Sequence, residues 1–171
     1  MITIKPISIL SENMPACIEL DVHPEQVKFV ADNAYSLAQA YDTNKAGADD
    51  GTAAVPYAVY EDDTMVGFAM YGYFPVDPDE DEDDEDSYDS KNPVYYFWRL
   101  LIDKNHQRRG IGAEVVRLVM EEIKRKPQGE ALHCYVSYDA ENIGSKTTFT
   151  NYGFEEDGRV IGGELVAKFA L

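Results

Sequence analysis

Apolar residues recur at three- and four-residue steps in two stretches of the chain, and each stretch predicts a helix. The first is HPEQVKFVADNAYSLAQAYD, residues 23–42, in which Pro24 suits a first helical position. The second begins in the glycine turn at residues 110–112 and stops before Pro127. Residues 142–151 predict a further short helix.

Shorter apolar stretches predict strands. VPYAVYEDDTMVGFAMYGYF predicts two of them, Val55 to Tyr60 and Met65 to Phe74, joined by a turn. PVYYFWRLLID, residues 93–103, has one arginine among aromatic and aliphatic residues before its final aspartate, which is typical of a strand buried on both faces. ALHCYVSY predicts another strand, and FEEDGRVIGGELVAKFAL predicts a closing hairpin that turns at Gly162-Gly163.

The order of these elements indicates the fold class. The strand–turn–helix–strand unit at residues 94–138 is typical of sheets that mix strands with crossover helices. We therefore expect an α/β (α+β) protein with a mixed central β-sheet flanked by helices. A chain of 171 residues predicts a single domain, residues 1–171.

The charge is negative and strongly peaked. The formal net charge is −17, and ten of the 32 acidic residues lie in DPDEDEDDEDSYD, residues 77–89. Because ten carboxylates cannot be buried together, we interpret residues 77–91 as a solvated acidic connection. This charge repels nucleic acid and anionic membranes and attracts cations. We therefore expect no nucleic-acid partner and no membrane partner.

The remaining composition indicates a compartment. No apolar run approaches the ~20 residues that a membrane span needs, and Lys5 and Pro6 interrupt any signal-peptide pattern. Cys17 and Cys134 argue against a disulfide framework and fit a reducing compartment, so we expect a cytoplasmic protein. The three histidines have no metal-ligand spacing with each other or with the cysteines, so no metal is expected.

HQRRGIGAEVV, residues 106–116, places two arginines and two glycines at the start of a predicted helix. A helix N-terminus presents unpaired N–H groups and a positive dipole, and Gly110 and Gly112 let an anion approach the backbone. The stretch lacks the Walker pattern, and the dinucleotide fingerprint would need a small residue where Val115 stands. A phosphate group is the expected ligand, and a tight turn without a ligand is the alternative.

The pattern Gln107-x-x-Gly110-x-Gly112 after RLLID resembles the pyrophosphate loop of the GNAT superfamily of N-acetyltransferases. HCYVSYDAEN and NYGF match the strand, asparagine and Gly-Phe that follow in this family. HPEQVKFVADNAYSLAQAY, VGFAMYGYFP and WRLLID also resemble a bacterial subgroup of spermine/spermidine (diamine) acetyltransferases. The resemblance implies a GNAT fold, with a splayed strand before the pyrophosphate loop and helix.

The implied reaction moves acetyl from acetyl-CoA directly to a primary amine of a small polycation, spermidine or spermine. The resemblance also implies that the backbone of Leu101 and Ile102 binds the pantetheine arm, and that an N–H near Leu101 stabilises the oxyanion. The other implied coenzyme A contacts are Gln107, Arg108, Arg109, Gly110, Ile111, Gly112, Ala113, Asn142 and Phe149.

The family's usual general acid is a tyrosine, and this chain has Phe149 at that position. We predict Tyr152, one helical turn further on, as the acid. Tyr138 is an alternative, and so is departure of the thiolate without a dedicated acid. The preceding strand has no carboxylate, so the expected base is a water chain to the acidic connection, Glu25 or Asp32.

Two other functions stay open at this point. The acceptor is alternatively an aminoglycoside, another small amine or a peptide N-terminus. The missing tyrosine at position 149 also allows a non-catalytic acyl-CoA sensor. Dimers are common in the family, so a homodimer is a further expectation.

Overall fold

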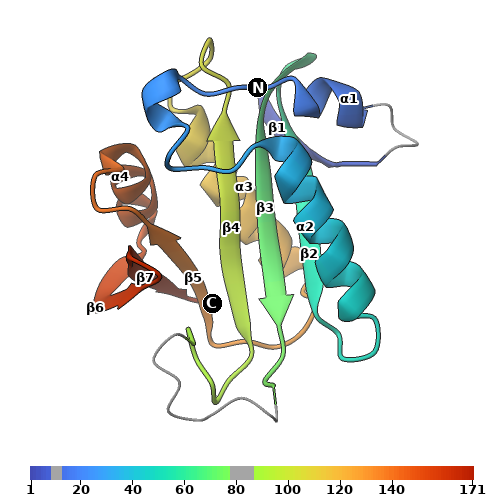
Figure 1. The fold of residues 1–171 in the computed structure, drawn as a ribbon, viewed down its shortest axis with the longest axis vertical. Helices are drawn as coiled ribbons and strands as arrows, with labels where there is room; N and C mark the ends of the chain where they lie inside the picture. Colours follow the sequence, from blue (N-terminus) through green and yellow to red (C-terminus); the bar gives the residue numbers. More distant parts are fainter. Residues whose placement is uncertain (9–12, 78–86) are drawn as a thin grey trace.

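The computed structural model describes residues 1–8, 13–77 and 87–171. Its seven strands form one sheet in the order β1-β2-β3-β4-β5-β7-β6, with helices on both faces (Figure 1). The strands are β1 (Ile2–Pro6), β2 (Ala53–Glu61), β3 (Thr64–Phe74), β4 (Val94–Ile102), β5 (His133–Tyr138), β6 (Glu155–Ile161) and β7 (Glu164–Ala170). The helices are α1 (Asn13–Ile18), the 3-10 turn η2 (Pro24–Gln26), α2 (Asn33–Ala46), α3 (Ile111–Arg125) and α4 (Ile143–Tyr152).

The predicted mixed sheet is confirmed. β2 and β3 form an antiparallel hairpin, and β4 and β5 are parallel strands that are joined through α3. The closing hairpin turns at Gly162 and Gly163, whose φ angles of 58° and 89° lie in the left-handed region. A type I′ hairpin turn needs this region at both central residues, which explains the Gly-Gly pair.

The helix predicted for residues 23–42 is wrong at its start. Residues 24–26 form only the turn η2, and α2 begins at Asn33. Asp32 has an extended backbone, and its side chain accepts a hydrogen bond from the N–H of Tyr35 at 2.7 Å, so it caps α2 at this point. The apolar spacing therefore merged two separate elements. β1 and α1 were not predicted, since each is only five or six residues long.

The two faces of the sheet have separate cores. α3 packs on one face through residues that include Val115, Val119 and Met120, each with 0% exposure. Fully burying such a side chain contributes about 1.5–3 kcal/mol, so the apolar stripe fixes α3 to the sheet. α1 and α2 cover the opposite face over β2 and β3 (Figure 1). The described helices include none that is long and apolar enough to cross a membrane.

β4 and β5 separate in the middle of the sheet. They pair only through Val94–Tyr96 and His133–Tyr135. Beyond this point β4 keeps β3 on one side, where the register shifts and leaves Trp98 without a partner residue. The resulting gap interrupts the sheet and gives access to the backbone of β4.

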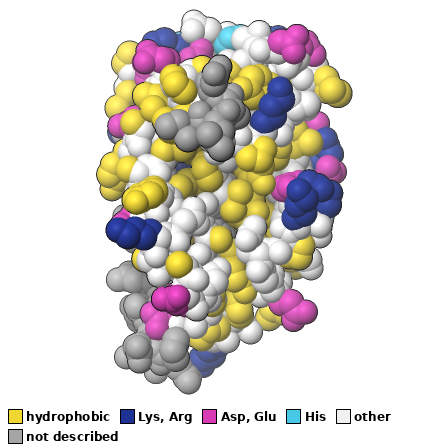
Figure 2. Space-filling view, turned by 90° about the vertical axis from the view of Figure 1, so that its right-hand side faces the viewer, with side chains coloured by type: hydrophobic (Ala, Val, Ile, Leu, Met, Phe, Trp, Pro, Cys, Tyr) yellow, Lys and Arg dark blue, Asp and Glu magenta, His cyan; other side chains and the backbone are white. Residues whose placement is uncertain are grey.

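Two expectations about the surface stay predictions. Residues 78–86, most of the acidic connection, lie outside the described residues. Figure 2 shows a band of hydrophobic side chains on the side of the molecule that carries the β1 edge, with charged side chains around it. No partner chain lies on the described residues of this band, and the homodimer stays a prediction.

Candidate functional site

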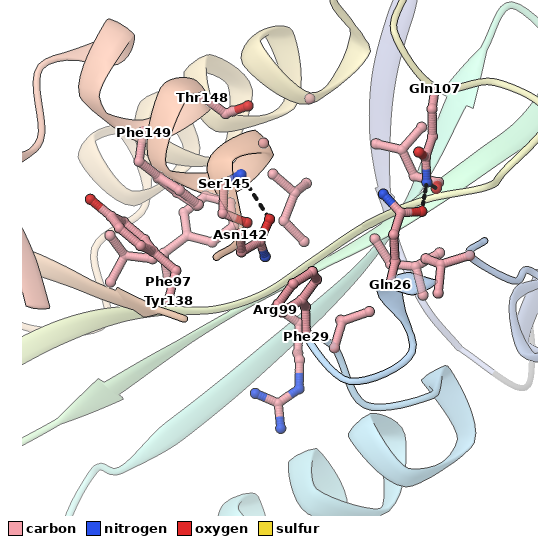
Figure 3. A pocket seen from close by; sticks show the side chains of 18 of the residues that line it. Gln26, Phe29, Phe97, Arg99, Gln107, Tyr138, Asn142, Ser145, Thr148 and Phe149 are labelled. Carbon is pink, nitrogen blue, oxygen red and sulfur yellow. Dashed lines mark hydrogen bonds between the residues drawn. The ribbon is translucent and has the colours of Figure 1, made fainter. Parts of the chain in front are cut away.

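A cavity of about 810 Å³ lies at the gap between β4 and β5 (Figure 3). Its walls come from both strands, from the first turns of α3 and α4, and from residues 27–31. Most of the predicted site residues line it: Leu101, Ile102, Gln107, Arg108, Gly110, Ile111, Gly112, Ala113, Asn142 and Phe149. Arg109 and Tyr152 are the predicted residues that do not.

The first turn of α3 has the geometry of an anion site. Gly110 is the N-cap residue with φ 78°, and no side chain caps the helix there. A Cβ atom built on Gly110 would meet no atom within 4 Å, so open space lies beside this end of the helix. The first N–H groups of any helix lack intrahelical acceptors. Open space therefore lies beside the end of α3 that carries these N–H groups.

Gly112 is the second residue of α3 and lines the cavity, and the packing of the protein does not require a glycine there. A Cβ atom on Gly112 would lie 3.8 Å from Thr148 and 3.9 Å from Leu100, which are ordinary contacts. A helical glycine costs about 1 kcal/mol relative to alanine, so this residue weakens the helix without a steric reason inside the protein. A ligand that approaches the backbone at Gly112 supplies such a reason.

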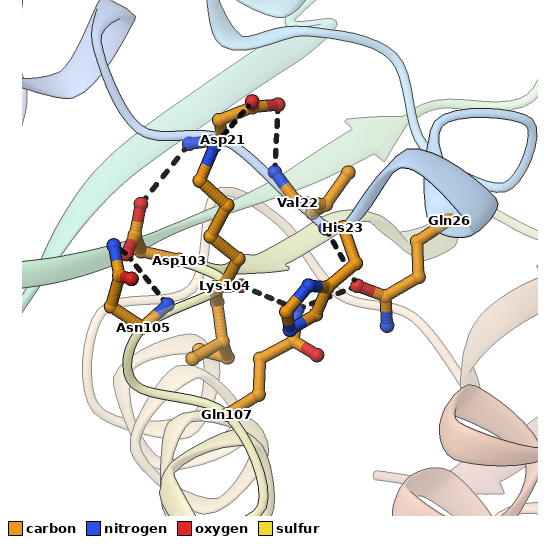
Figure 4. Close-up of polar contacts among 9 residues, drawn as sticks. Asp21, Val22, His23, Gln26, Asp103, Lys104, Asn105 and Gln107 are labelled. Atoms are coloured by element: carbon orange, nitrogen blue, oxygen red, sulfur yellow. Dashed lines mark hydrogen bonds and ion pairs between the residues drawn. The ribbon is translucent and has the colours of Figure 1, made fainter.

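Asp103 holds the loop between β4 and α3 in place (Figure 4). This 7% exposed side chain accepts hydrogen bonds from the N–H of Asp21 at 3.2 Å and of Asn105 at 3.0 Å. Burial opposes ionisation, but these hydrogen bonds outweigh it and lower the pKa of Asp103. Lys104 adds an ion pair to Asp21 at 3.0 Å. The loop is thus tied to residues 21–26, which are remote from it in sequence.

Gln107 joins the same network from the cavity side. Its Nε2 donates to the carbonyl of Ile102 at 2.9 Å and to Oε1 of Gln26 at 2.8 Å. Oε1 of Gln26 also accepts from the N–H of His23 at 3.1 Å. The side-chain amide of Gln107 therefore connects the end of β4 to η2, and it shapes the cavity besides lining it.

The two arginines of the loop have different surroundings. Arg109 lies outside the cavity, where it forms an ion pair with Glu61 at 2.8 Å. Arg108 lines the cavity with φ 60°, and no acidic side chain of the described residues pairs with it. Arg108 is therefore the arginine that is available to a bound anion.

The register of β4 turns the backbone of Leu101 away from the gap. The N–H of Asp103 donates to the carbonyl of Val66 in β3 at 2.9 Å. Since hydrogen-bonding directions repeat every second residue, the N–H of Leu101 also points to β3, where Phe68 is its partner residue. Leu100 and Ile102 present their backbone groups to the gap instead. Leu101 lines the cavity, but its N–H is not the group that faces a ligand there.

The predicted residues of α4 have structural partners. Asn142 is the N-cap residue, and its Oδ1 accepts from the N–H of Ser145 at 3.1 Å. Phe149 is 2% exposed, with its ring centroid 5.0 Å from that of Phe97 and 6.5 Å from that of the stacked Tyr138. Phe149 is thus an apolar wall where the family usually has a tyrosine.

The two tyrosines considered as the acid lie in different places. Tyr152 packs against Phe154 and Phe169 and does not line the cavity, although it shares the core side of α4 with Phe149. Tyr138 lines the cavity, and its hydroxyl donates to Glu156 at 3.0 Å. Burial, together with this hydrogen bond, raises the pKa of Tyr138. The structure does not bring Tyr152 to the reacting region.

Two of the carboxylates considered for the base, Glu25 and Asp32, lie outside the cavity, and residues 78–86 of the acidic connection are not among the described residues. Asp32 caps α2, and Glu25 is exposed on η2. The cavity instead contains Glu164 at the start of β7, which was not predicted. Its Oε2 accepts from the hydroxyl of Ser137 on β5.

Arg99 is a second cavity residue that was not predicted. Its guanidinium donates to the carbonyl of Trp98 and to Oε1 of Gln39, both at 2.8 Å, and it points from β4 towards α2 (Figure 3). Its buried Nε has no hydrogen-bond partner among the described residues. Burial lowers the pKa of Arg99. The single arginine inside an otherwise uncharged strand was the signal that could have found it.

Comparisons with known proteins agree with this geometry. The chain matches the sequence model of the Acetyltransferase (GNAT) family over residues 23–154. It is 26% identical over 153 residues to a "Probable spermine N(1)-acetyltransferase" of Bacillus subtilis subsp. natto and to a "Spermine/spermidine N(1)-acetyltransferase" of Bacillus subtilis strain 168. Each alignment covers 90% of this chain and 88% of the relative.

Solved structures are similar in fold. Aminoglycoside acetyltransferase AAC(6')-Ib in complex with coenzyme A has a TM-score of 0.68 at 16% identity, covering 100% of this chain and 94% of that chain. The PaiA N-acetyltransferase of Thermoplasma acidophilum, also with coenzyme A, has a TM-score of 0.66 at 14% identity, covering 100% and 99%. The predicted GNAT fold is confirmed by these similarities together with the family match.

Proposed function

The chain belongs to the Acetyltransferase (GNAT) family, and on this premise we propose that it acetylates a primary amine of spermidine or spermine. As a family member it is an N-acetyltransferase that takes acetyl from acetyl-CoA. The polyamine acceptor is supported by the similarity to two proteins named for spermine and spermidine, which extends over 90% of the chain. This similarity is the observation that carries the proposal.

The loop before α3 supports a site for the pyrophosphate of the donor. The open space at Gly110, the ordinary contacts at Gly112 and the uncapped helix end fit a phosphate group held by backbone N–H groups. Arg108 adds a positive charge on the same wall. Because the chain has a net charge of −17, this local arrangement has to oppose a general repulsion of a polyanion.

The gap in the sheet supports direct transfer. We infer that the backbone groups of Leu100 and Ile102 hold the pantetheine arm and the thioester carbonyl, since they face the gap. The ammonium group of the acceptor first gives one proton to solvent water. The neutral nitrogen then attacks the carbonyl carbon, the C–S bond breaks, and sulfur leaves with the electron pair as thiolate. The nitrogen gives its second proton to solvent water. Holding both reactants in line contributes roughly 7–11 kcal/mol to such reactions.

The leaving thiolate has no obvious tyrosine donor. Among the described residues the tyrosines that line the cavity are Tyr96 and Tyr138, and both hydroxyls already form hydrogen bonds. We therefore infer that coenzyme A leaves as a thiolate without a dedicated acid. The N-terminal end of α4 and the hydroxyls of Ser145 and Thr148, which line the cavity, are the groups that would stabilise it.

A second acceptor class is favoured by Arg99. A guanidinium inside the acceptor side of the cavity repels the second ammonium group of a polyamine. A small amine with a single positive charge avoids this repulsion. Such an amine is the second candidate for the acceptor.

The test is the release of coenzyme A thiol from acetyl-CoA in the presence of single amines. The panel contains spermidine, spermine, butylamine, kanamycin and a peptide with a free N-terminus. We expect spermidine- or spermine-dependent release, which Gly112→Trp abolishes because the indole fills the space beside the helix end. Release with butylamine alone would favour the second candidate. Saturable binding of acetyl-CoA without release for any amine would support the sensor instead.

A further inference from the structure

Glu164 is an acidic side chain on the cavity wall that lacks a cationic partner. Glu141 is the other carboxylate among the described residues that line the cavity, and it pairs with Lys28. No cation of the described residues forms an ion pair with Glu164, which is partly buried. A carboxylate withdrawn from water is stabilised by a cation or by hydrogen bonds. Glu164 accepts one hydrogen bond, on Oε2, and no described residue supplies the cation of an ion pair.

Each hydroxyl has a single proton, and this fixes the direction of the hydrogen bonds around Ser137. Ser137 donates its single hydroxyl proton to Oε2 of Glu164. The hydroxyl of Tyr96, 2.8 Å from Oγ of Ser137, must therefore donate to it, and Tyr88 donates to the same oxygen at 3.2 Å. Burial raises the pKa of Tyr96, with a smaller contribution from the neighbouring Tyr88, so this proton stays in place. The hydroxyl protons of the network therefore all point towards Glu164.

The network reaches the cavity wall from three strands. Ser137, Tyr96 and Glu164 come from β5, β4 and β7, and all three line the cavity on the face opposite α3. No described side chain donates a hydrogen bond to Oε1 of Glu164. The ring of Tyr96 lines the cavity, and its hydroxyl contacts Ser137. The neighbouring ring of Trp98 already has the guanidinium of Arg99 over it, 5.6 Å from the ring centroid. Aromatic faces beside a carboxylate attract an ammonium group.

Arg99 limits where a cation settles. It interacts electrostatically with Glu164 but forms no ion pair with it, because its guanidinium is held by Trp98 and Gln39. Its positive charge repels an ammonium group from the α2 side of the cavity. A bound cation is therefore expected near Glu164 and away from Arg99.

We propose that the carboxylate of Glu164 binds the ammonium group of the acceptor beside Tyr96, and so positions the amine at the gap. This inference rests on the proposed transfer to an amine. It adds a residue of β7 to the site and assigns it the recognition of a primary ammonium group, whichever amine carries it.

The experiment compares the wild-type protein with Glu164→Gln and Glu155→Gln. The first variant keeps the hydrogen bond from Ser137 and removes the charge, and the second removes the same charge from an exposed position on the adjacent β6. Two readouts are needed: initial rates for each amine of the panel, and calorimetric binding of the same amines with coenzyme A present. We expect Glu164→Gln to raise the KM and the dissociation constant of the amine by at least about ten-fold. The KM of acetyl-CoA should change by less than about two-fold.

The outcomes separate this inference from the proposed function. Unchanged amine binding in Glu164→Gln, or an equal effect of Glu155→Gln, would overturn the role of Glu164. Binding of an amine by the wild type without turnover, lost in Glu164→Gln, would support Glu164 and overturn the transfer. A wild type that neither binds nor acetylates any amine would overturn both.

Discussion

The cavity has two halves that are built in different ways. The donor half is mainly a continuous segment, residues 100–113, whose backbone conformation and helix end provide the binding groups. The acceptor half combines side chains from separate elements, among them Tyr96, Ser137 and Glu164. The donor half is therefore a local sequence motif. The residues of the acceptor half come together only when the sheet forms.

This difference has a chemical reason. A pyrophosphate is recognised by N–H groups and a dipole, which every helix start provides once glycines clear the approach. An amine needs a negative charge at one point in space, and a single glutamate after a Gly-Gly turn has no distinguishing pattern in the sequence. The donor half is thus recognisable in the sequence, and the acceptor half is not.

The largest expected effect concerns the donor half. Gly112→Trp should abolish measurable binding of acetyl-CoA, a loss of at least about 100-fold. Gly112→Ala separates an effect on ligand binding from an effect on packing, because the added Cβ has room in the protein without ligand. We expect it to raise the free energy of unfolding by about 0.5–1 kcal/mol while weakening acetyl-CoA binding. Urea unfolding and calorimetry measure the two quantities. A variant that is destabilised, with acetyl-CoA binding unchanged, would show that Gly112 serves packing.

The next effect concerns selectivity in the acceptor half. Arg99→Gln removes the charge that repels a second ammonium group and keeps a side chain able to contact Gln39. The ratio of kcat/KM for spermidine to that for butylamine should rise roughly ten-fold. Arg125→Gln, at the exposed end of α3, is the matched control and should leave the ratio unchanged. A falling ratio in Arg99→Gln would mean that Arg99 assists polyamine binding.

A smaller effect is expected when the hydrogen bonds that hold the loop between β4 and α3 are weakened. Asp103→Asn weakens the hydrogen bonds from the N–H groups of Asp21 and Asn105, and should lower stability by about 1.5–3 kcal/mol at pH 7. Since the folded pKa of Asp103 is lowered, the wild-type advantage is present above about pH 4 and is lost as the pH falls through the lowered pKa. Urea unfolding at a series of pH values measures this convergence. A constant difference down to the acid end would exclude the charge of Asp103 as its cause.

The smallest effect concerns Tyr152. Because its ring packs against Phe154 and Phe169 outside the cavity, Tyr152→Phe should change kcat by less than about two-fold. The measurement is the pH profile of kcat, which a general acid would shape at high pH. A drop of about 100-fold or more would restore Tyr152 as the acid.

The sequence supported the mixed sheet, the closing hairpin and the loop before α3, because each depends on a local pattern of apolar residues and glycines. The predicted start of α2 was wrong, since the apolar spacing continues through the N-cap residue Asp32. The side to which Leu101 turns its N–H could not be predicted from the sequence, because which backbone groups of β4 face the gap depends on its register with β3. Glu164 was missed because its partner Ser137 lies 27 residues away.

The central claim is that the two halves bind different substrates and meet at the gap between β4 and β5. Initial rates with both substrates varied, for Gly112→Ala and Glu164→Gln, test it most directly. We expect Gly112→Ala to raise the KM of acetyl-CoA alone, and Glu164→Gln to raise the KM of the amine alone. If either variant raised both KM values equally, the division of the cavity into a donor half and an acceptor half would be contradicted.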